Sequence, residues 1–310
     1  MDAARVYDTV IIGGGPGGYT AALYAARAGL DTVVLEKLSA GGQMALTQQV
    51  DNYPGFPEGI DGFDLAQKMQ QQAERFGAKT AYALVTGVDL KSTPKRIQTS
   101  EGDFYGRTVI LATGADPRPL GLPKERELTG RGVAYCAACD GMFYRDKTVV
   151  VVGGGNSAAA DALLLSRVAK KVIVVHRRDA LRATKVYHAA LQQAENVAFR
   201  WNSQVVELLH ENKVTGVRLR NLHTQEEEVL PCDGVFISIG RKPATELVAG
   251  QLALDDKGYV LAGESTATSI AGVYAVGDVR SKGLRQIVTA VADGAVAVHQ
   301  IEEYLAEHES

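Results

Sequence analysis

Two cysteines separated by two residues are the pair in this sequence best suited to covalent chemistry. They occupy the stretch CAAC at residues 136–139. Cysteines at this spacing form either a redox pair or half of a metal site. A zinc site needs two further cysteine or histidine ligands, but Cys232 stands alone and the six histidines form no second pair with ligand spacing. The spacing therefore predicts a redox-active dithiol formed by Cys136 and Cys139, and no metal.

The neighbours of this pair suggest further roles. Asp140 follows Cys139 directly, which makes it a candidate proton donor and acceptor; the alternative is that it caps a helix N-terminus. A thiolate here would be the nucleophile, and either a helix start or a charge-transfer partner would lower its pKa. Cys232, between Pro231 and Asp233, is expected to be an unreactive small residue at a strand edge.

A glycine-rich stretch near the N-terminus has the spacing of a dinucleotide-binding turn. GGGPGG at residues 13–18 follows a β-branched run at 7–12 and precedes an alanine-rich helix that is expected to reach residue 28. The glycines permit a tight turn and let backbone amides approach a pyrophosphate at the helix N-terminus. A strand predicted at 32–36 ends in an acid that can bind the hydroxyls of a ribose. This first site comprises Gly13, Gly15, Pro16, Gly18 and Glu36.

A second copy of the pattern begins 140 residues later, counted from Gly13 to Gly153, as GGGNSA. Glu36 lies 23 residues after Gly13, whereas the residue 23 after Gly153 is His176, and arginines follow it. An acid would repel the 2′-phosphate of NADPH, whereas guanidinium groups pair with it. A solvated basic turn is the alternative. We expect a site that prefers NADPH to NADH, formed by Gly153, Gly155, Asn156, Ser157, Ala158, His176, Arg177, Arg178 and Arg182.

Two dinucleotide sites and one dithiol form a route for electrons. A nicotinamide gives up two electrons as hydride and is a poor direct reductant of a disulfide, whereas a flavin accepts hydride and passes electrons to sulfur. FAD is therefore expected in the first site. Asp278, after Gly277 at a predicted strand end, is a candidate to hold the ribityl chain. Arg285 and Gln286, at the start of a helix predicted at 285–305, are candidates to stabilise negative charge on the reduced ring.

The elements that must position these residues are two strand–helix–strand units. In the second unit we expect a strand at 148–152, a helix to about residue 168 and a strand at 171–176. The tail after Pro243 is too short for a third domain, so it is expected to return to the first unit. The fold class is therefore α/β, with two Rossmann-like dinucleotide-binding domains, the second inserted in the first. The expected domains are 1–115 with 244–310 for FAD, and 116–243 for NADPH and the CxxC pair, joined by two crossings that can serve as a hinge.

Composition excludes several other classes of protein. The 310 residues are 46% hydrophobic and 22% charged, a globular balance, and this length suggests about two domains. The net charge of −3 provides no basic field to attract nucleic acid or an anionic membrane. No apolar run of ~20 residues is available to span a bilayer. The N-terminal ten residues carry acids where a signal peptide carries its basic end, so a cytoplasmic protein is expected.

Six motifs together resemble the low-molecular-weight, bacterial-type thioredoxin reductases over essentially the whole chain. In the glutathione-reductase-like branch the redox cysteines lie early in the FAD module, whereas the corresponding residues 41–46 here contain none. The loop at 239–245 departs from the pattern, with Arg241 where some members have His and Ala244 where Asn is usual. The motifs are GGGPGG at 13–18, ATGA at 112–115, CAACDG at 136–141, GGGNSA at 153–158, HRRDALR at 176–182 and GD at 277–278.

The resemblance implies a homodimer with non-covalent FAD that uses NADPH to reduce thioredoxin or a thioredoxin-like protein disulfide. It implies that Cys139 is the sulfur nearest the flavin, that Cys136 attacks the substrate and that Asp140 is the acid/base group. Because one domain must bring both its dithiol and its nicotinamide to one flavin, a rotation about the two crossings is expected. The resemblance adds five residues to the FAD site: Gly42, Gln43, Asn52, Thr113 and Gly114.

Other functions fit parts of the sequence. One is a related flavoenzyme that receives electrons from ferredoxin or oxidises a small dithiol with oxygen. The intact second glycine turn and its arginines argue against this function, since neither reaction needs NADPH. Another is a non-catalytic redox sensor, which would not need a dithiol beside a flavin.

Overall fold

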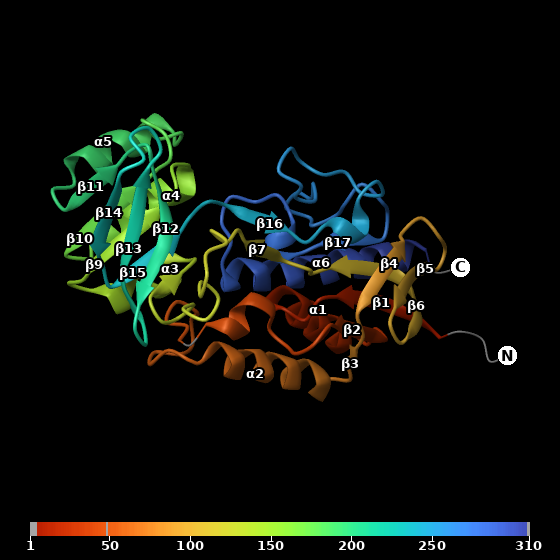
Figure 1. Ribbon diagram of the computed structural model, residues 1–310. Helices are drawn as coiled ribbons and strands as arrows, with labels where there is room; N and C mark the ends of the chain where they lie inside the picture. The colour runs from red at the N-terminus through yellow and green to blue at the C-terminus, as the bar shows by residue number, and fades with distance from the viewer. Residues whose placement is uncertain (1–4, 48, 309–310) are drawn as a thin grey trace. The chain divides into compact units, whose positions relative to one another are not determined.

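The computed structural model describes residues 5–47 and 49–308, and the chain divides into two compact units. Unit 1 combines the chain up to Asp116 with the chain from Lys242 onward, and unit 2 is Pro117–Arg241. The first four residues of the N-terminal segment considered above lie outside the described residues. Two short strands, β7 (Ala115–Pro117) and β16 (Arg241–Pro243), carry the chain from one unit to the other and pair with each other (Figure 1).

Unit 1 is built on a mostly parallel sheet. Ile11 on its central strand packs into one apolar cluster, and Val10 and Ile12 pack into another, so the strand is buried on both faces. In register, Ile12 lies beside Leu35 and Leu111, so the residues that follow these three strands meet at one edge. In spatial order the strands are β3 (Lys79–Tyr82), β2 (Thr32–Glu36), β1 (Val6–Ile12), β6 (Gly102–Leu111), β5 (Lys95–Thr99) and β4 (Val85–Asp89), with β17 (Val273–Ala275) beside β6.

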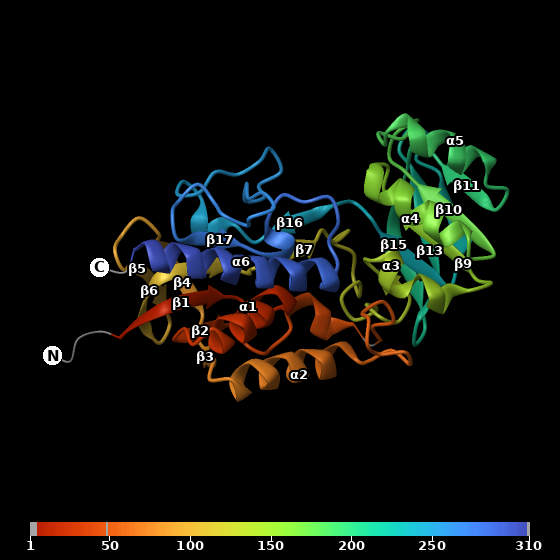
Figure 2. The same cartoon turned by 180° about the vertical axis from the view of Figure 1, so that it is seen from behind.

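Three long helices complete unit 1: α1 (Pro16–Arg27), α2 (Gly62–Arg75) and α6 (Ile287–Glu307). Helices α1 and α6 lie side by side in both views (Figure 2). Gly294 allows this approach, because a Cβ there would lie 2.4 Å from the carbonyl oxygen of Gly17. Helix α6 begins at Ile287 rather than at residue 285, because Gln286 is its N-cap and forms a capping box with Thr289.

Unit 2 contains a parallel sheet and a small antiparallel sheet. Within the parallel sheet, Val152 lies beside Val175 and Ile237, so the residues after these strands again share one edge. The parallel sheet has the order β11 (Val197–Arg200), β10 (Lys171–Val175), β9 (Thr148–Val152), β15 (Gly234–Ile237) and β8 (Val133–Ala134). The antiparallel sheet comprises β12 (Ser203–His210), β13 (Val214–Asn221) and β14 (Glu227–Pro231).

The helices of unit 2 are α3 (Ala137–Asp140), α4 (Asn156–Ser166) and α5 (Lys185–Gln193). Helix α4 is two residues shorter than expected at its C-terminus. Short 3-10 turns lie at Gly42–Leu46, Gly141–Tyr144, Glu246–Val248 and Gly277–Val279. The predicted α/β fold with two Rossmann-like units is confirmed. No helix within the described residues is long and apolar enough to cross a membrane.

A buried cluster of charges holds the loop after β17 in unit 1. The carboxylate of Asp293, on α6, accepts hydrogen bonds from Arg280 at 2.7 and 2.9 Å and from Lys282 at 2.7 Å. It also accepts the backbone N–H of Gly277 at 2.8 Å. Burial alone would raise the pKa of Asp293, but the hydrogen bonds from Arg280, Lys282 and Gly277 outweigh burial and lower it.

We expect Asp293→Asn to destabilise the protein by about 3–5 kcal/mol, because it leaves two buried cations without their anion. Since the pKa of Asp293 is lowered on folding, its contribution is present above the ordinary carboxyl pKa and is lost as pH falls through the lowered value. Denaturant midpoints measured against pH test this. Asp103→Asn is the matched control, because it removes only the exposed bridge to Arg96, and a shift as large as that of Asp293→Asn would contradict the expectation.

Candidate active site

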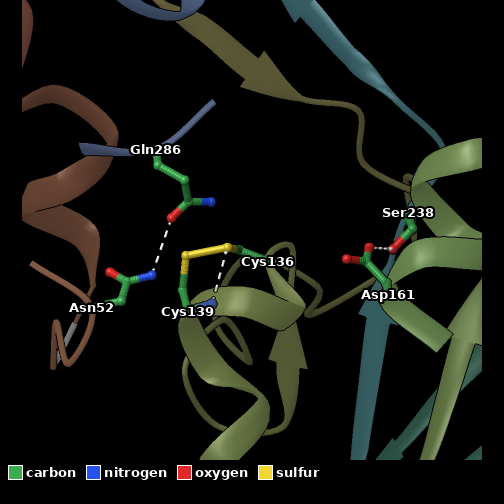
Figure 3. The surroundings of a disulfide bond; sticks show 6 residues. All are labelled: Asn52, Cys136, Cys139, Asp161, Ser238 and Gln286. Atoms are coloured by element: carbon green, nitrogen blue, oxygen red, sulfur yellow. Dashed lines mark hydrogen bonds between the residues drawn. A yellow bond between two sulfur atoms is a disulfide. The ribbon is translucent and has the colours of Figure 1, made fainter. Parts of the chain in front are cut away.

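A disulfide bond joins Cys136 and Cys139 in unit 2 (Figure 3). Cys136 is the N-cap residue of α3, and its Sγ accepts the backbone N–H of Cys139 at 3.2 Å. The single turn of α3 therefore fixes both sulfurs on one local scaffold. Both cysteines are partly exposed, so the pair is within reach of solvent.

Asp140 ends α3, and its burial raises the pKa of its carboxyl to about 6. The group therefore changes protonation state close to neutral pH, which suits an acid/base role. Cys136 caps α3, and Asp140 occupies the N-cap position of the 3-10 turn that follows, but its side chain makes no capping bond there. Cys232 is buried, and burial raises the pKa of its thiol to about 12, so it is an unreactive thiol as expected.

The first glycine turn lies at the carboxyl edge of the sheet in unit 1. A Cβ on Gly13, whose φ is +105°, would lie 2.5 Å from the carbonyl oxygen of Ala112, and one on Gly18 would lie 2.0 Å from that of Gly13. Only glycine allows these contacts. Gly15 has no atom within 4 Å of its Cβ position, so the turn is open to a ligand at the start of α1, where Pro16 is the first residue.

Glu36 reaches back from the end of β2 to this turn. Its carboxylate accepts the N–H of Gly14 at 2.7 Å and that of Lys37 at 2.8 Å. Gly42 also lies at the turn, since its Cβ position is 3.9 Å from the Cα of Gly15. The first-site residues Gly13, Gly15, Pro16, Gly18, Glu36 and Gly42 are therefore brought together.

The other candidate residues of unit 1 form pairs around this edge. Thr113 donates its hydroxyl to the carbonyl oxygen of Ala244 at 2.8 Å, and the N–H of Ala244 donates to Gly114 at 3.0 Å. The side chain of Gln43 donates to Asp116 at 2.7 Å. These contacts tie the segment after β6 to the chain that returns from unit 2.

Two residues that are 234 positions apart in the sequence meet in unit 1. The amide of Asn52 donates to Oε1 of Gln286 at 3.1 Å (Figure 3). The guanidinium of Arg285 lies over the ring of Tyr259, 4.0 Å from its centroid, and donates to the carbonyl oxygen of Asp278 at 3.4 Å. The start of α6 and the loop after β17 therefore contribute to one region.

The second glycine turn repeats this geometry in unit 2. A Cβ on Gly153 would lie 2.4 Å from the carbonyl oxygen of Ser238, whereas Gly155 has open space around its Cβ position. Asn156 accepts the N–H of Thr184 at 2.8 Å. At the start of α4, Ser157 is exposed and Ala158 is buried.

His176 packs against this turn, because a Cβ on Gly154 would lie 2.3 Å from its ring. The side chain is 4% exposed, and its Nε2 atom is buried without a hydrogen-bond partner. Burial lowers the pKa of His176, and the positive charges of Arg182, Arg178 and Arg177 lower it further, so the ring is neutral. Trp201 meets the ring of His176 edge to face.

The three arginines are exposed around this neutral ring. The N–H of Arg182 donates to the carbonyl oxygen of Gly154 at 2.6 Å, which ties the arginine loop to the glycine turn. Within the described residues, no carboxylate forms an ion pair with Arg177, Arg178 or Arg182. A cationic cluster without an acid beside an open turn fits a phosphorylated nucleotide.

Sequence reasoning missed a polar contact in the same unit. Asp161, on α4, accepts the hydroxyl of Ser238 at 2.5 Å (Figure 3). Burial raises the pKa of Asp161 and outweighs both this hydrogen bond and the charge of Arg241. The available signal was a single acid inside an alanine- and leucine-rich helix. Within the described residues, no group of three or more metal-ligating side chains forms a metal site.

The chain is similar in sequence and in fold to proteins named thioredoxin reductase. The thioredoxin reductase of Streptomyces clavuligerus is 47% identical over 97% of this chain and 94% of its own length. That of Mycolicibacterium smegmatis is 46% identical over 98% of both chains. The crystal structure of thioredoxin reductase from Streptococcus pyogenes superposes with a TM-score of 0.91 at 43% identity and covers 98% of this chain and 100% of that one.

A family-level match spans both units. Residues 7–294 match the pyridine nucleotide-disulphide oxidoreductase family, a range that includes both glycine turns and the disulfide. The chain therefore belongs to the pyridine nucleotide-disulphide oxidoreductase family and, within it, to the group of bacterial-type thioredoxin reductases that its sequence motifs predict.

Proposed function

We propose that this protein uses NADPH to reduce the disulfide of thioredoxin or of a thioredoxin-like protein, through FAD and the Cys136–Cys139 pair. The observation that carries the proposal is the disulfide beside a carboxyl whose pKa is about 6, in the unit that also contains the arginine cluster. Relatives that are named thioredoxin reductase support the choice of substrate.

FAD is assigned to unit 1, and when bound it would take up two electrons from a nicotinamide and release them to a disulfide. The open turn at Gly15 supports pyrophosphate binding at the start of α1, and Glu36 retains acceptor capacity for a ribose. The proposed FAD residues are Gly13, Gly15, Pro16, Gly18, Glu36, Gly42, Gln43, Asn52, Thr113, Gly114, Asp278, Arg285 and Gln286.

NADPH is assigned to unit 2. The three exposed guanidinium groups beside the glycine turn, which form no ion pair with a carboxylate of the described residues, support binding of a 2′-phosphate. The proposed NADPH residues are Gly153, Gly155, Asn156, Ser157, Ala158, His176, Arg177, Arg178 and Arg182.

The dithiol reduces its substrate by two thiol–disulfide exchanges. The thiolate of Cys136 attacks one sulfur of the substrate disulfide, which forms a mixed disulfide and releases the other substrate sulfur. The thiolate of Cys139 then attacks Cys136, which releases the second substrate sulfur and restores the Cys136–Cys139 disulfide. Asp140 supplies a proton to a departing sulfur, and burial, which raises its pKa to about 6, retains this proton to a higher pH than an ordinary carboxyl would.

The surface beside the dithiol supports a protein substrate. Met142 and Phe143 follow α3 directly and are 53% and 44% exposed. Exposed apolar side chains at this position can meet an apolar rim around a substrate disulfide. β7 and β16 are the two covalent links between the units, and we propose that a rotation about them accompanies turnover in a homodimer.

The first test compares the initial rates of reduction of an oxidised thioredoxin with NADPH and with NADH. We expect NADPH to be strongly preferred, and Arg177→Ala/Arg178→Ala to raise KM for NADPH by about ten- to a hundredfold while KM for NADH changes little. Arg167→Ala/Lys170→Ala is the matched control, because it also removes two exposed positive charges. These two residues precede β10, whereas the arginines of the proposed site follow it. Equal effects on the two nucleotides would mean that the arginines do not bind the 2′-phosphate.

Replacement of one sulfur tests the order of events at the dithiol. Cys139→Ser is expected to retain FAD and flavin reduction by NADPH but to lose thioredoxin reduction, because no disulfide can form. Stopped-flow absorbance and a coupled turnover assay measure the two reactions separately. Cys232→Ser, which changes a buried thiol outside the pair, should keep both activities. Thioredoxin reduction by Cys139→Ser would disprove the role of Cys139.

The pKa of Asp140 predicts a pH dependence. As a proton donor the carboxyl must be protonated, so turnover at saturating substrate should fall as pH rises through about 6. Asp140→Asn should lower turnover by about a hundredfold and remove this decline from the pH–rate profile. An unchanged alkaline limb in Asp140→Asn would assign the titration to another group.

A further inference from the structure

One buried carboxylate in unit 2 has no part in the site described so far. Glu125 is 4% exposed and its carboxylate accepts four hydrogen bonds. Oε1 accepts the N–H of Leu120 at 2.9 Å and the hydroxyl of Tyr135 at 2.7 Å. Oε2 accepts the N–H of Gly121 at 2.8 Å and that of Leu122 at 3.1 Å. Glu125 therefore binds two separate segments of the chain at once.

One segment adjoins the dithiol, and the other adjoins the first link between the units. Tyr135 lies between β8 and Cys136, so its side chain is fixed one residue before the sulfur that attacks the substrate. Residues 120–122 begin three residues after β7, the first link between the units. The ring of Tyr135 and the side chains of Leu120 and Leu122 pack against the same apolar cluster. Glu125 thus connects the link with the residue beside the dithiol.

This arrangement holds Tyr135 at a fixed distance from residues 120–122. Burial raises the pKa of the Tyr135 phenol, and its hydrogen bond to Glu125 raises it further, so the hydroxyl remains a donor. Moving a carboxylate out of water is costly, and an apolar side chain would fill the same space at lower cost. Three backbone donors and one side-chain donor instead impose a defined geometry on the chain around them.

We propose that Glu125 and Tyr135 are positioning residues that hold Cys136 in place for its attack on the substrate disulfide. The inference rests on the proposed function, because it assigns Glu125 and Tyr135 to the dithiol step of that reaction. Thiol–disulfide exchange needs the attacking sulfur in line with the bond that breaks. A displacement of this sulfur by about 1 Å lowers the rate on the order of a hundredfold. The backbone of Cys136 is covalently fixed to Tyr135 on one side and enters α3 on the other.

Tyr135→Phe is the sharpest variant, because it removes the hydroxyl and keeps the ring in the apolar cluster. With the full-length, FAD-loaded protein we expect kcat for thioredoxin to fall by about tenfold. KM for thioredoxin should stay within about twofold. The hydroxyl that Tyr135→Phe removes donates to the buried carboxylate of Glu125, so its loss does not change the surface that a protein substrate contacts. Flavin reduction by NADPH should not change. Tyr274→Phe is the matched control, because it removes a tyrosine hydroxyl bond, to Gln300 at 3.1 Å, in unit 1.

A second measurement does not depend on thioredoxin. In the chemically reduced protein, the rate of Cys136 alkylation by iodoacetamide reports the position of its sulfur against the N–H of Cys139. We expect alkylation at neutral pH to be slowed at least about threefold in Tyr135→Phe and to be unchanged in Tyr274→Phe, because a displaced sulfur loses the N–H that favours its thiolate.

The outcomes separate the inference from the proposed function. Wild-type protein that reduces no thioredoxin contradicts the proposed function, while the alkylation rates still decide the role of Tyr135. Equal alkylation and equal kcat in Tyr135→Phe and the wild type would overturn the inference. A fall in flavin reduction that matches the fall in kcat would also overturn it, because the effect would then be general.

Discussion

Each unit depends on the close approach of a glycine to the carbonyl oxygen that follows a neighbouring strand. A side chain at Gly13 would collide with the oxygen of Ala112, just past β6, and one at Gly153 would collide with that of Ser238, just past β15. The absence of a side chain at Gly13 and Gly153 lets the ends of these paired parallel strands lie close together, at the edge where the following helix begins. The candidate nucleotide sites lie at these two edges.

The two units use the same backbone geometry with opposite charge. At the end of the second strand, unit 1 has Glu36, which hydrogen-bonds to its own glycine turn, whereas unit 2 has a neutral His176 surrounded by arginines. A carboxylate and a cluster of guanidinium groups favour different substituents on a ribose. A difference of a few side chains therefore distinguishes two sites that the fold alone would make equivalent.

Local patterns in the sequence predicted most of the fold and much of the candidate site. Strands β2 and β9 have the predicted bounds, because apolar runs followed by glycine or an acid are signals within a few residues. The Asp293 cluster, the Asp161–Ser238 bond and the Glu125–Tyr135 bond were missed. Each joins residues 10 to 77 positions apart, and no spacing rule links such residues before the strands between them are paired. The predicted start of α6 at residue 285 was wrong, because Gln286 is the N-cap residue and the first helical residue is Ile287.

The position of Trp201 has a practical consequence. It is the only tryptophan in the chain, it stacks on Phe199, and it meets the ring of His176 edge to face. The indole therefore adjoins the arginine-lined turn of unit 2. Its emission is an intrinsic optical reporter of that turn, so nucleotide occupancy can be followed without a label and separately from the visible absorbance of a flavin.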